Sequence, residues 1–252
     1  MRRMRHIKAR EFQNCAIAFD ATRPSAYDAT SGGSLVGADA EVLRWEDQSG
    51  NGRHITQSGA GAKPRYRASG LNGMPSLEFD GTNDLLTSGT LDVLSFYDAA
   101  GTSTFVLGVF SQDAAKAQNT LIGTGLAGTN RLLVHASYDN VLYFDPGSTG
   151  STGRVSVAQP SGWDGAAHVL AGGRNGSNGY IASDNATLVT KSDFSYTVSS
   201  TSVAFSIGGV PALPSISHDG HVSEICVWAR SASPAVARRM WHSRMRKWRI
   251  SG

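Results

Sequence analysis

The stretch WEDQSGNGRHITQ, residues 45–57, joins a tryptophan, a run of acids and amides, two glycines and a histidine. Its two glycines permit backbone angles that other residues resist, and the short polar side chains beside them favour a tight turn. The same polar side chains suit an ion or a sugar, so the local chemistry leaves all three roles open.

Short apolar or alternating segments continue on both sides of this stretch. We count fourteen, from EVLRWED at residues 41–47 to HVSEICVWAR at residues 221–230. Clusters of Gly, Asn, Asp and Ser separate them, which is the pattern of strands joined by turns. The pattern predicts an all-β protein, a two-sheet antiparallel sandwich. A content of 29 glycines, 8 prolines and 17% charged residues in 252 residues fits one turn-rich globular core.

The exception is SASPAVARRMWHSRMRKW at residues 231–248, which carries a helical pattern. Ser233 is suited to cap a helix, and Pro234 is suited to its first position. An apolar stripe at helical spacing is formed by Ala237, Trp241, Met245 and Trp248. We therefore expect a short C-terminal amphipathic helix over residues 233–248, packed on the sandwich.

Basic residues are concentrated at the two ends of the chain, five in residues 1–10 and six in residues 238–252, with no acid in either window. The rest of the chain holds 12 basic against 20 acidic groups. Such ends can bind an acidic partner or neutralise the acidic body in the folded protein. Nucleic acid is not favoured, because the body resembles no nucleic-acid-binding motif. No apolar run approaches the ~20 residues of a membrane helix.

Four segments occur in a recognisable order: WEDQSGNGRHITQ (45–57), KPRYRASGLNGMPSLEFDGTNDLL (63–86), STFVLGVF (103–110) and GHVSEICVWARSASPAVARRM (220–240). Their order resembles the concanavalin A-like, laminin-G-like jelly-roll family, in versions found in phage and prophage virion proteins and in large bacterial surface proteins. The resemblance covers Phe19 to Trp248. It implies two curved antiparallel sheets, with relatives that often bind carbohydrates and some that hold calcium at a loop edge. It transfers no particular ligand, because this fold hosts lectins, adhesion modules, glycosidases and structural domains.

On this resemblance, residues 1–18 form a basic N-terminal arm with a possible first strand, and residues 19–252 form the jelly-roll domain with its helix. In the opening stretch, Trp45 then points into the sandwich, Asp47 turns outward, and SGNG makes the turn. For His54, a packed or hydrogen-bonded role is expected ahead of a ligand role.

A calcium site at a loop edge could draw on Asp47, Asn51, Asp80 and Asp84. Ca²⁺ takes 6–8 oxygen ligands, and the sequence contains no ligand loop of diagnostic spacing. For Asp47 and Asn51, hydrogen bonds to turn amides are expected ahead of ion coordination. The protein is thus expected to require no cofactor, with Ca²⁺ the one ion that these residues could hold. Neither Cys15 nor Cys226 has the spacing of a zinc site, and a buried reduced thiol is expected at Cys226.

Sugar sites combine an aromatic face with a few amide or carboxylate groups. Residues of these types occur in three loop-rich regions, and they form the candidate carbohydrate-binding set: Tyr138, Asp139, Asn140, Trp163, Asp164, Arg174 and Asn175. Each is individually expected more often as loop scaffolding or core edge.

An enzyme is the weaker alternative. Glu78 and Asp80 match the first two positions of the E-x-D-x-x-E strand of laminarinase-like glycosidases, which share this sandwich, but Asn83 occupies the third. Asp84 would project differently after the DGTN turn. The asparagine at position 83 therefore removes the second carboxylate that the acid/base and nucleophile roles require. The sequence also lacks GxSxG, HExxH, Walker and strand-linked GxGxxG motifs, so no catalytic activity is expected.

These inferences favour a non-catalytic, lectin-like module of a phage or prophage virion that binds cell-surface carbohydrate. Its basic termini would contact other virion proteins, in a homo-oligomer or larger assembly and without a membrane partner. The N-terminal residues lack the apolar core of a secretion signal, which fits a virion component made in the host cytoplasm. The alternative is a structural decoration or fibre-attachment protein without sugar binding, and a glycoside hydrolase is less favoured still.

Overall fold

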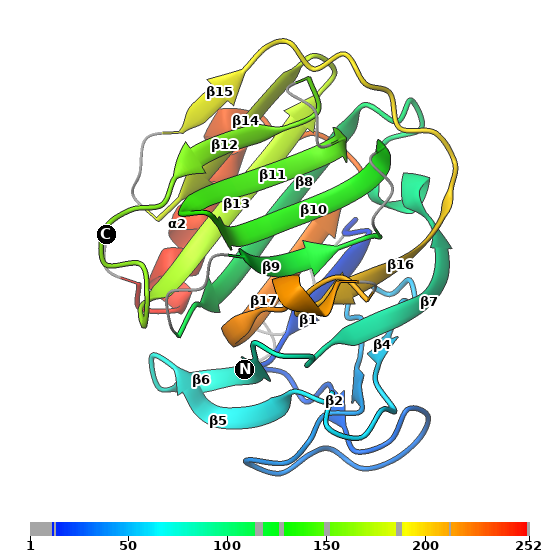
Figure 1. Ribbon diagram of the computed structural model, residues 1–252, viewed down its shortest axis with the longest axis vertical. Coiled ribbons are helices and arrows are strands. Elements are labelled where there is room, and N and C mark those ends of the chain that lie inside the picture. Colours follow the sequence, from blue (N-terminus) through cyan, green and yellow to red (C-terminus); the bar gives the residue numbers. More distant parts are fainter. Residues whose placement is uncertain are drawn as a thin grey trace, which may run out of the picture.

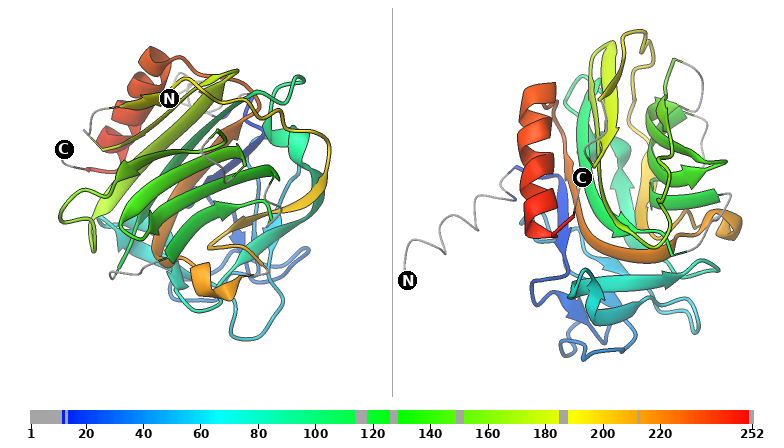
Figure 2. Two further views of the ribbon diagram at one scale, coloured as in Figure 1. Left: turned by 45° about the horizontal axis from the view of Figure 1, so that its top comes forward. Right: turned by 90° about the vertical axis from the view of Figure 1, so that its left-hand side faces the viewer.

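The computed structural model describes residues 12, 14–113, 118–125, 129–148, 152–184, 188–211 and 213–250. Two antiparallel sheets face each other, and one helix lies against the outside of one of them (Figures 1 and 2). The expected fold class, a two-sheet antiparallel sandwich with a short C-terminal helix, is confirmed.

Sheet A has eight strands in the order β15-β14-β13-β8-β17-β6-β5, with β1 paired to β17. Its strands are β1 (Ile17–Asp20), β5 (Arg65–Leu71), β6 (Met74–Asp80), β8 (Ser103–Ser111), β13 (Ala167–Asn175), β14 (Asn178–Ser183), β15 (Val189–Lys191) and β17 (Asp219–Trp228). Because β6 and β1 pair with successive halves of β17, the first strand of the fold is held by the last. The boundary predicted at residue 18 falls inside β1, and the division of the chain into an arm and a domain stays a prediction.

Sheet B has nine strands in the order β12-β11-β10-β9-β16-β7-β4-β3-β2. Its strands are β2 (Ala26–Tyr27), β3 (Arg44–Trp45), β4 (Ile55–Thr56), β7 (Leu86–Asp92), β9 (Gln118–Gly123), β10 (Thr129–Tyr138), β11 (Val141–Ser148), β12 (Val155–Ala158) and β16 (Ser202–Ile207). Among the described residues, two single-turn 3₁₀ helices lie in the connections: η1 (Val93–Phe96) and η2 (Pro214–Ile216).

Sheet A is the middle layer of the molecule. Its inner face shares the main core with sheet B, where the rings of Phe19 and Trp45 are centred 5.1 Å apart. Its outer face shares a second core with the helix α2 (Pro234–Lys247). Every residue of β8 is buried, because alternate side chains of a strand point to opposite faces and both faces here are covered.

The C-terminal helix forms as its sequence predicts. The Ser233 hydroxyl accepts a hydrogen bond from the Val236 amide at 3.3 Å, and Pro234 is the first helical residue. The predicted stripe is buried against sheet A: Ala237, Trp241, Met245 and Trp248. No helix in the described part of the chain is both long and apolar enough to span a membrane.

The opening stretch folds into two short paired strands, with Trp45 opposite Ile55. Gly50 and Gly52 have φ of +91° and +69°, the left-handed backbone that a glycine turn supplies. Trp45 is fully buried, as expected. The His54 ring accepts a hydrogen bond from the Asp47 amide at 3.1 Å, which confirms its hydrogen-bonded role.

Candidate functional site

A charged cleft of about 360 Å³ lies at the end of sheet A formed by β5, β6 and the start of β17. Six carboxyl groups line it: Glu41, Glu78, Asp80, Asp84, Asp113 and Asp219. Three cationic side chains line it as well: Lys63, Arg65 and Arg67. The carboxyl groups outnumber the cations two to one, so the cleft favours a positively charged ligand.

The register of the strands brings these groups together. Glu78 lies opposite His221, and Asp80 lies opposite Asp219, where β6 pairs with β17. Leu77 and Phe79 point into the main core, so Glu78 and Asp80 point to the other face of sheet A.

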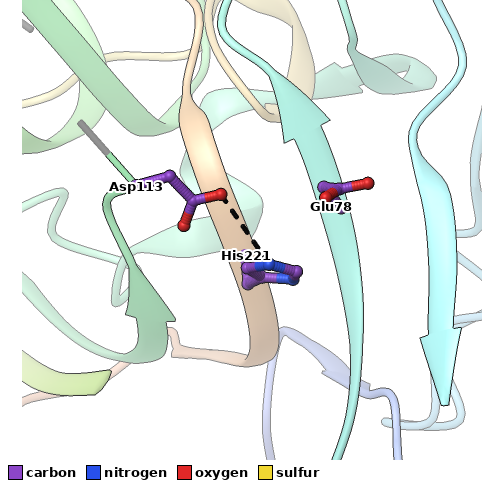
Figure 3. A group of neighbouring side chains, drawn as sticks. All are labelled: Glu78, Asp113 and His221. Carbon is purple, nitrogen blue, oxygen red and sulfur yellow. Dashed lines mark ion pairs between the residues drawn. The ribbon is translucent and has the colours of Figure 1, made fainter. Parts of the chain in front are cut away.

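Asp113 follows β8, the strand on the other side of β17, and its amide donates to the Asp219 carbonyl at 3.1 Å. Figure 3 shows Glu78, Asp113 and His221 side by side, contributed from three adjacent parts of the sheet.

Glu78 and Asp113 line the cleft, and His221 lies beside them. One ligand atom from each of the three lies within 4.8 Å of the other two. The His221 Nε2 atom is 3.7 Å from Asp113 Oδ2, an ion-pair distance rather than a hydrogen bond. The other ring nitrogen, Nδ1, is 2.9 Å from the Ser76 hydroxyl. Arg67 donates from Nε to Glu78 Oε2 at 2.7 Å.

Asp80 and Asp84 form the loop at the end of β6. Asp80 Oδ1 accepts hydrogen bonds from the amides of Thr82 and Asn83 at 2.8 and 3.2 Å. Asp84 Oδ2 accepts from the Asp80 amide at 3.1 Å. Burial of Asp84 and the neighbouring Asp80 carboxylate raise the pKa of Asp84 to about 6. Asp80 and Asp84, two of the four residues predicted to bind calcium, thus both line this cleft.

Asp47 and Asn51 lie in the turn between β3 and β4 and act as hydrogen-bonding groups. Asp47 is only 8% exposed, so the expectation that it turns outward is wrong. Its carboxylate accepts from the amides of Ala18 and Arg53 at 2.9 and 3.1 Å, because burial makes those amides need an acceptor. The Asn51 side chain donates to the Cys15 carbonyl at 2.9 Å. Both residues tie the turn to the first strand.

A second candidate surface lies on the outer face of sheet B, and we call it the tyrosine face: Tyr138, Tyr143, His135 and Arg154. The ring centroids of Tyr138 and Tyr143 are 6.1 Å apart, and each packs edge-on against His135. The Arg154 guanidinium lies over the Tyr143 ring at 4.2 Å, a favourable cation–π geometry. Both tyrosines are partly exposed.

A buried ionic network fixes this surface. Asp145 is fully buried and accepts from Arg154 Nε and its terminal nitrogen at 2.6 and 2.7 Å, and from Arg131 at 2.6 Å. His135 is 3% exposed and pairs with the Thr120 hydroxyl at 2.8 Å, and burial lowers the pKa of His135 to about 4. The tyrosines thus lie on a hydrogen-bonded base of strand residues.

The predicted carbohydrate residues fall in three places. Tyr138 belongs to the tyrosine face, and Asp139 and Asn140 form the exposed two-residue turn beside it, with φ of +52° and +61°. Asp164 is exposed and accepts from the Gln112 side chain at 2.9 Å, while Asn175 is exposed at the end of β13.

The other two predicted residues are inside the protein. The Trp163 ring is stacked on His168 with centroids 3.6 Å apart and is 2% exposed. Arg174 is also 2% exposed and donates to the carbonyls of Pro146 and Gly176 at 2.9 and 3.0 Å. Neither side chain has a face that is open to a ligand, because protein groups already occupy its contacts.

Sequence reasoning missed Tyr143, His135, Arg154 and Asp145. The signal was strand alternation. In VLYFDPG, Leu142 and Phe144 are core residues, so Tyr143 and Asp145 point to the opposite, outer face of sheet B. The ion pairs that join β10, β11 and β12 depend on register, which the sequence does not specify.

No protein-family model matches the chain, and no curated protein matches it in sequence. Its fold is similar to that of a GH54 α-L-arabinofuranosidase, at 14% identity and a TM-score of 0.58, over 90% of this chain and 62% of the enzyme. It is also similar to domain 4 of a GH43 extracellular arabinanase from Geobacillus stearothermophilus, solved with arabinotriose, at 11% identity and a TM-score of 0.57, over 90% and 98% of the two chains.

A third similar structure is the binding domain of botulinum neurotoxin serotype G, at 11% identity and a TM-score of 0.53, over 91% of this chain and 51% of that one. At these identities the similarity establishes a shared β-sandwich fold. The chain spans less than two thirds of the arabinofuranosidase and about half of the neurotoxin domain.

Proposed function

We propose that this protein is a non-catalytic carbohydrate-binding module and that the tyrosine face is its sugar-binding surface. The observation that carries the proposal is a pair of partly exposed, mutually packed tyrosines. One of them, Tyr143, lies against Arg154, which is bonded to the fully buried Asp145. Aromatic rings beside charged and amide groups are what a sugar ring requires. A rigid base lowers the entropy cost of binding.

The fold comparison supports the choice of ligand to test first. A β-sandwich that aligns with nearly all of this chain was solved with arabinotriose. Arabinotriose is therefore the first probe, followed by an array of bacterial surface polysaccharides, since the proposed setting is recognition of a cell surface.

The test is calorimetric titration of the full chain with these sugars, before and after Tyr143→Ala and Tyr138→Ala. We expect at least about 10-fold weaker binding in each variant, because a lost stacking contact of ~1.4 kcal/mol corresponds to that factor. The matched control is Tyr27→Ala, which removes another sheet-B tyrosine with an arginine, Arg44, over its ring at 4.2 Å. Unchanged affinity in the Tyr143 and Tyr138 variants, or no binding across the array, would overturn the proposal.

The absence of catalysis is part of the same proposal. Asn83 lies in the exposed turn after β6 and not on the strand that carries Glu78, and Glu78 is engaged by Arg67. We expect no oligosaccharide release from arabinan or β-glucans. Release that disappears in Glu78→Gln would establish an enzyme instead.

We further propose that the module belongs to a phage or prophage virion, made in the host cytoplasm, and that basic groups near the C terminus contact the assembly. Arg244 and Lys247 are used inside the protein, in ion pairs with Glu224. Exposed basic side chains remain at Arg238, Arg239, Arg246 and Arg249. The basic N-terminal residues 1–10 lie outside the described residues.

Reversal of charge at Arg238 and Arg239 should reduce incorporation into particles and leave sugar affinity unchanged. Incorporation at the wild-type level would show that Arg238 and Arg239 do not contact the assembly. A protein that is incorporated normally and binds no sugar would instead be a structural decoration or fibre-attachment protein.

A further inference from the structure

Two carboxylates that line the charged cleft and a histidine beside them are side chains of the kind that hold a metal ion. Glu78, Asp113 and His221 offer two carboxylates and one imidazole, with ligand atoms mutually within 4.8 Å (Figure 3). Two ligands at tetrahedral angles on Zn²⁺ lie roughly 3.4 Å apart, given metal–ligand bonds of about 2.0–2.2 Å. The 3.7 Å separation of His221 Nε2 and Asp113 Oδ2 is close to this value.

The imidazole is oriented by a buried partner. Ser76 is fully buried, and its hydroxyl lies 2.9 Å from His221 Nδ1. The tautomer that donates from Nδ1 to this hydroxyl leaves the lone pair on Nε2, the nitrogen that faces Asp113. Metal-binding histidines commonly have such a partner on the second nitrogen.

Irregular backbone segments, one in β5 and one at the start of β17, support the position of the His221 ring. The pairing of β5 with β6 shifts between Arg67 and Leu71, and a Cβ at Gly70 would lie 2.8 Å from His221 Nδ1. Gly220 has φ of +139°, and a Cβ there would collide with the Ser111 carbonyl. These glycines let β5 close over the histidine and let β17 approach the end of β8, where Asp113 begins its loop.

Carboxylate groups at the site and in the adjoining cleft supply negative charge for a cation. Glu78 Oε2 accepts a hydrogen bond from Arg67, an interaction that orients the carboxylate. Asp84, 7% exposed, lines the same cleft, and its Oδ1 has no hydrogen-bond donor among the described residues. Burial, and after it the neighbouring Asp80 carboxylate, raise the pKa of Asp84.

We propose that Glu78, Asp113 and His221 bind a divalent first-row transition-metal ion, with Zn²⁺ as the reference ion. Imidazole nitrogen favours Zn²⁺ and its neighbours over Ca²⁺, which prefers an all-oxygen set. Three protein ligands leave at least one position for water. This site lies on sheet A, whereas the proposed sugar surface lies on sheet B, so the two proposals can fail separately.

The test uses the full chain freed of metals with EDTA and titrated calorimetrically with ZnCl₂. We expect one ion per chain, with affinity at least about 100-fold weaker in Asp113→Asn and in His221→Gln, each of which removes a ligand. The Asp113 side chain is 42% exposed, so its replacement should leave the circular dichroism spectrum unchanged. Ser76→Ala should weaken binding by about 10-fold, because it removes only the orienting partner.

The matched control is His242→Gln, since His242 is an exposed histidine on α2 outside the cleft. Its Zn²⁺ affinity should equal that of the wild type. Wild-type affinity in folded Asp113→Asn, no binding by the wild type, or tighter binding of Ca²⁺ than of Zn²⁺ would each overturn the proposal. Sugar titrations repeated in EDTA keep this result distinct from the outcome at the tyrosine face.

Discussion

At the scale of single residues, the protein buries charges and then satisfies them. Asp145 has two arginine partners, and Asp47 has backbone amides from two segments. Unpartnered buried charge is costly, so these contacts offset the cost of burying the two carboxylates. Asp84 is different, because its carboxylate is mostly buried and lies near the like charge of Asp80.

We therefore predict that Asp84→Asn stabilises the metal-free protein at neutral pH. In the unfolded chain Asp84 has the ordinary pKa of 3.8, whereas in the folded protein the pKa is about 6. The folded state binds the proton more tightly, so stability decreases as pH rises between these values. A shift of about two units corresponds to ~3 kcal/mol, and solvent in the open cleft reduces this to about 1–2 kcal/mol.

Urea denaturation in EDTA at pH 4 and pH 8 measures this effect. The advantage of Asp84→Asn over the wild type should be present at pH 8 and should shrink toward pH 4. An equal free-energy difference at both pH values would contradict the assignment of the penalty to ionised Asp84.

His135 gives a pH dependence of the opposite sign. Burial lowers its pKa from 6.5 to about 4, so the folded protein holds it neutral. Its contribution to stability is present above pH 6.5 and is lost as pH falls toward 4. His135→Gln should flatten the wild-type loss of stability between pH 6.5 and pH 4, and histidine resonances followed by NMR should show one ring that stays neutral at pH 5. If the resonance lost in His135→Gln instead protonates near pH 6.5 in the wild type, burial does not lower the pKa of His135.

At the scale of elements, α2 is attached to sheet A by more than its apolar stripe. Glu224 on β17 is fully buried and accepts from Arg244 at 2.7 Å, Lys247 at 2.6 Å and the Trp248 indole at 3.0 Å. These partners lower the pKa of Glu224 despite its burial. The basic C-terminal end predicted from sequence thus partly neutralises the body of the protein, one of the two roles expected for it.

Removal of one partner of this buried pair should be severe. We predict that Arg244→Ala lowers the free energy of unfolding by about 3–5 kcal/mol, because it leaves Glu224 without its main counter-charge. Arg246→Ala, an exposed neighbour on the same helix, should change stability by less than about 0.5 kcal/mol. Urea denaturation measures the free energy of unfolding of both variants. A loss in Arg244→Ala as small as that in Arg246→Ala would mean that the helix is held by its apolar face alone.

Elements with strong local signals were predictable, and those defined by distant pairing were not. The helix follows from Ser233, Pro234 and the apolar stripe, and the hairpin at Asp139 and Asn140 follows from residues that tolerate left-handed backbone. In contrast, β5 has mostly exposed or half-exposed residues without alternation. The strand β2 has two residues, which pair with β3 and with Leu35 in the loop that follows. The cleft depends on β5 and on the register of β6 with β17, so its histidine partner could not be identified from sequence.

At the scale of the whole molecule, one sheet connects two cores. Phe105 and Trp228 on sheet A pack with α2, while Phe110 and Ile225 on the same strands pack with sheet B. Because both cores share these strands, we predict one cooperative unfolding transition. Far-ultraviolet circular dichroism and tryptophan fluorescence should give the same urea midpoint. A separate early transition, with loss of helical signal while Trp45 remains buried, would show that α2 unfolds alone.

The burial of sheet A on both sides also bears on how such a protein can change over generations. A substitution on β8, β13 or the later half of β17 alters one core or the other, so most replacements there are removed by selection for a folded chain. The partly exposed side chains on the outside of sheet B carry no such double constraint. Mutation can exchange a tyrosine there at little cost to the fold, so lineages that share this scaffold should diverge first in what that surface recognises.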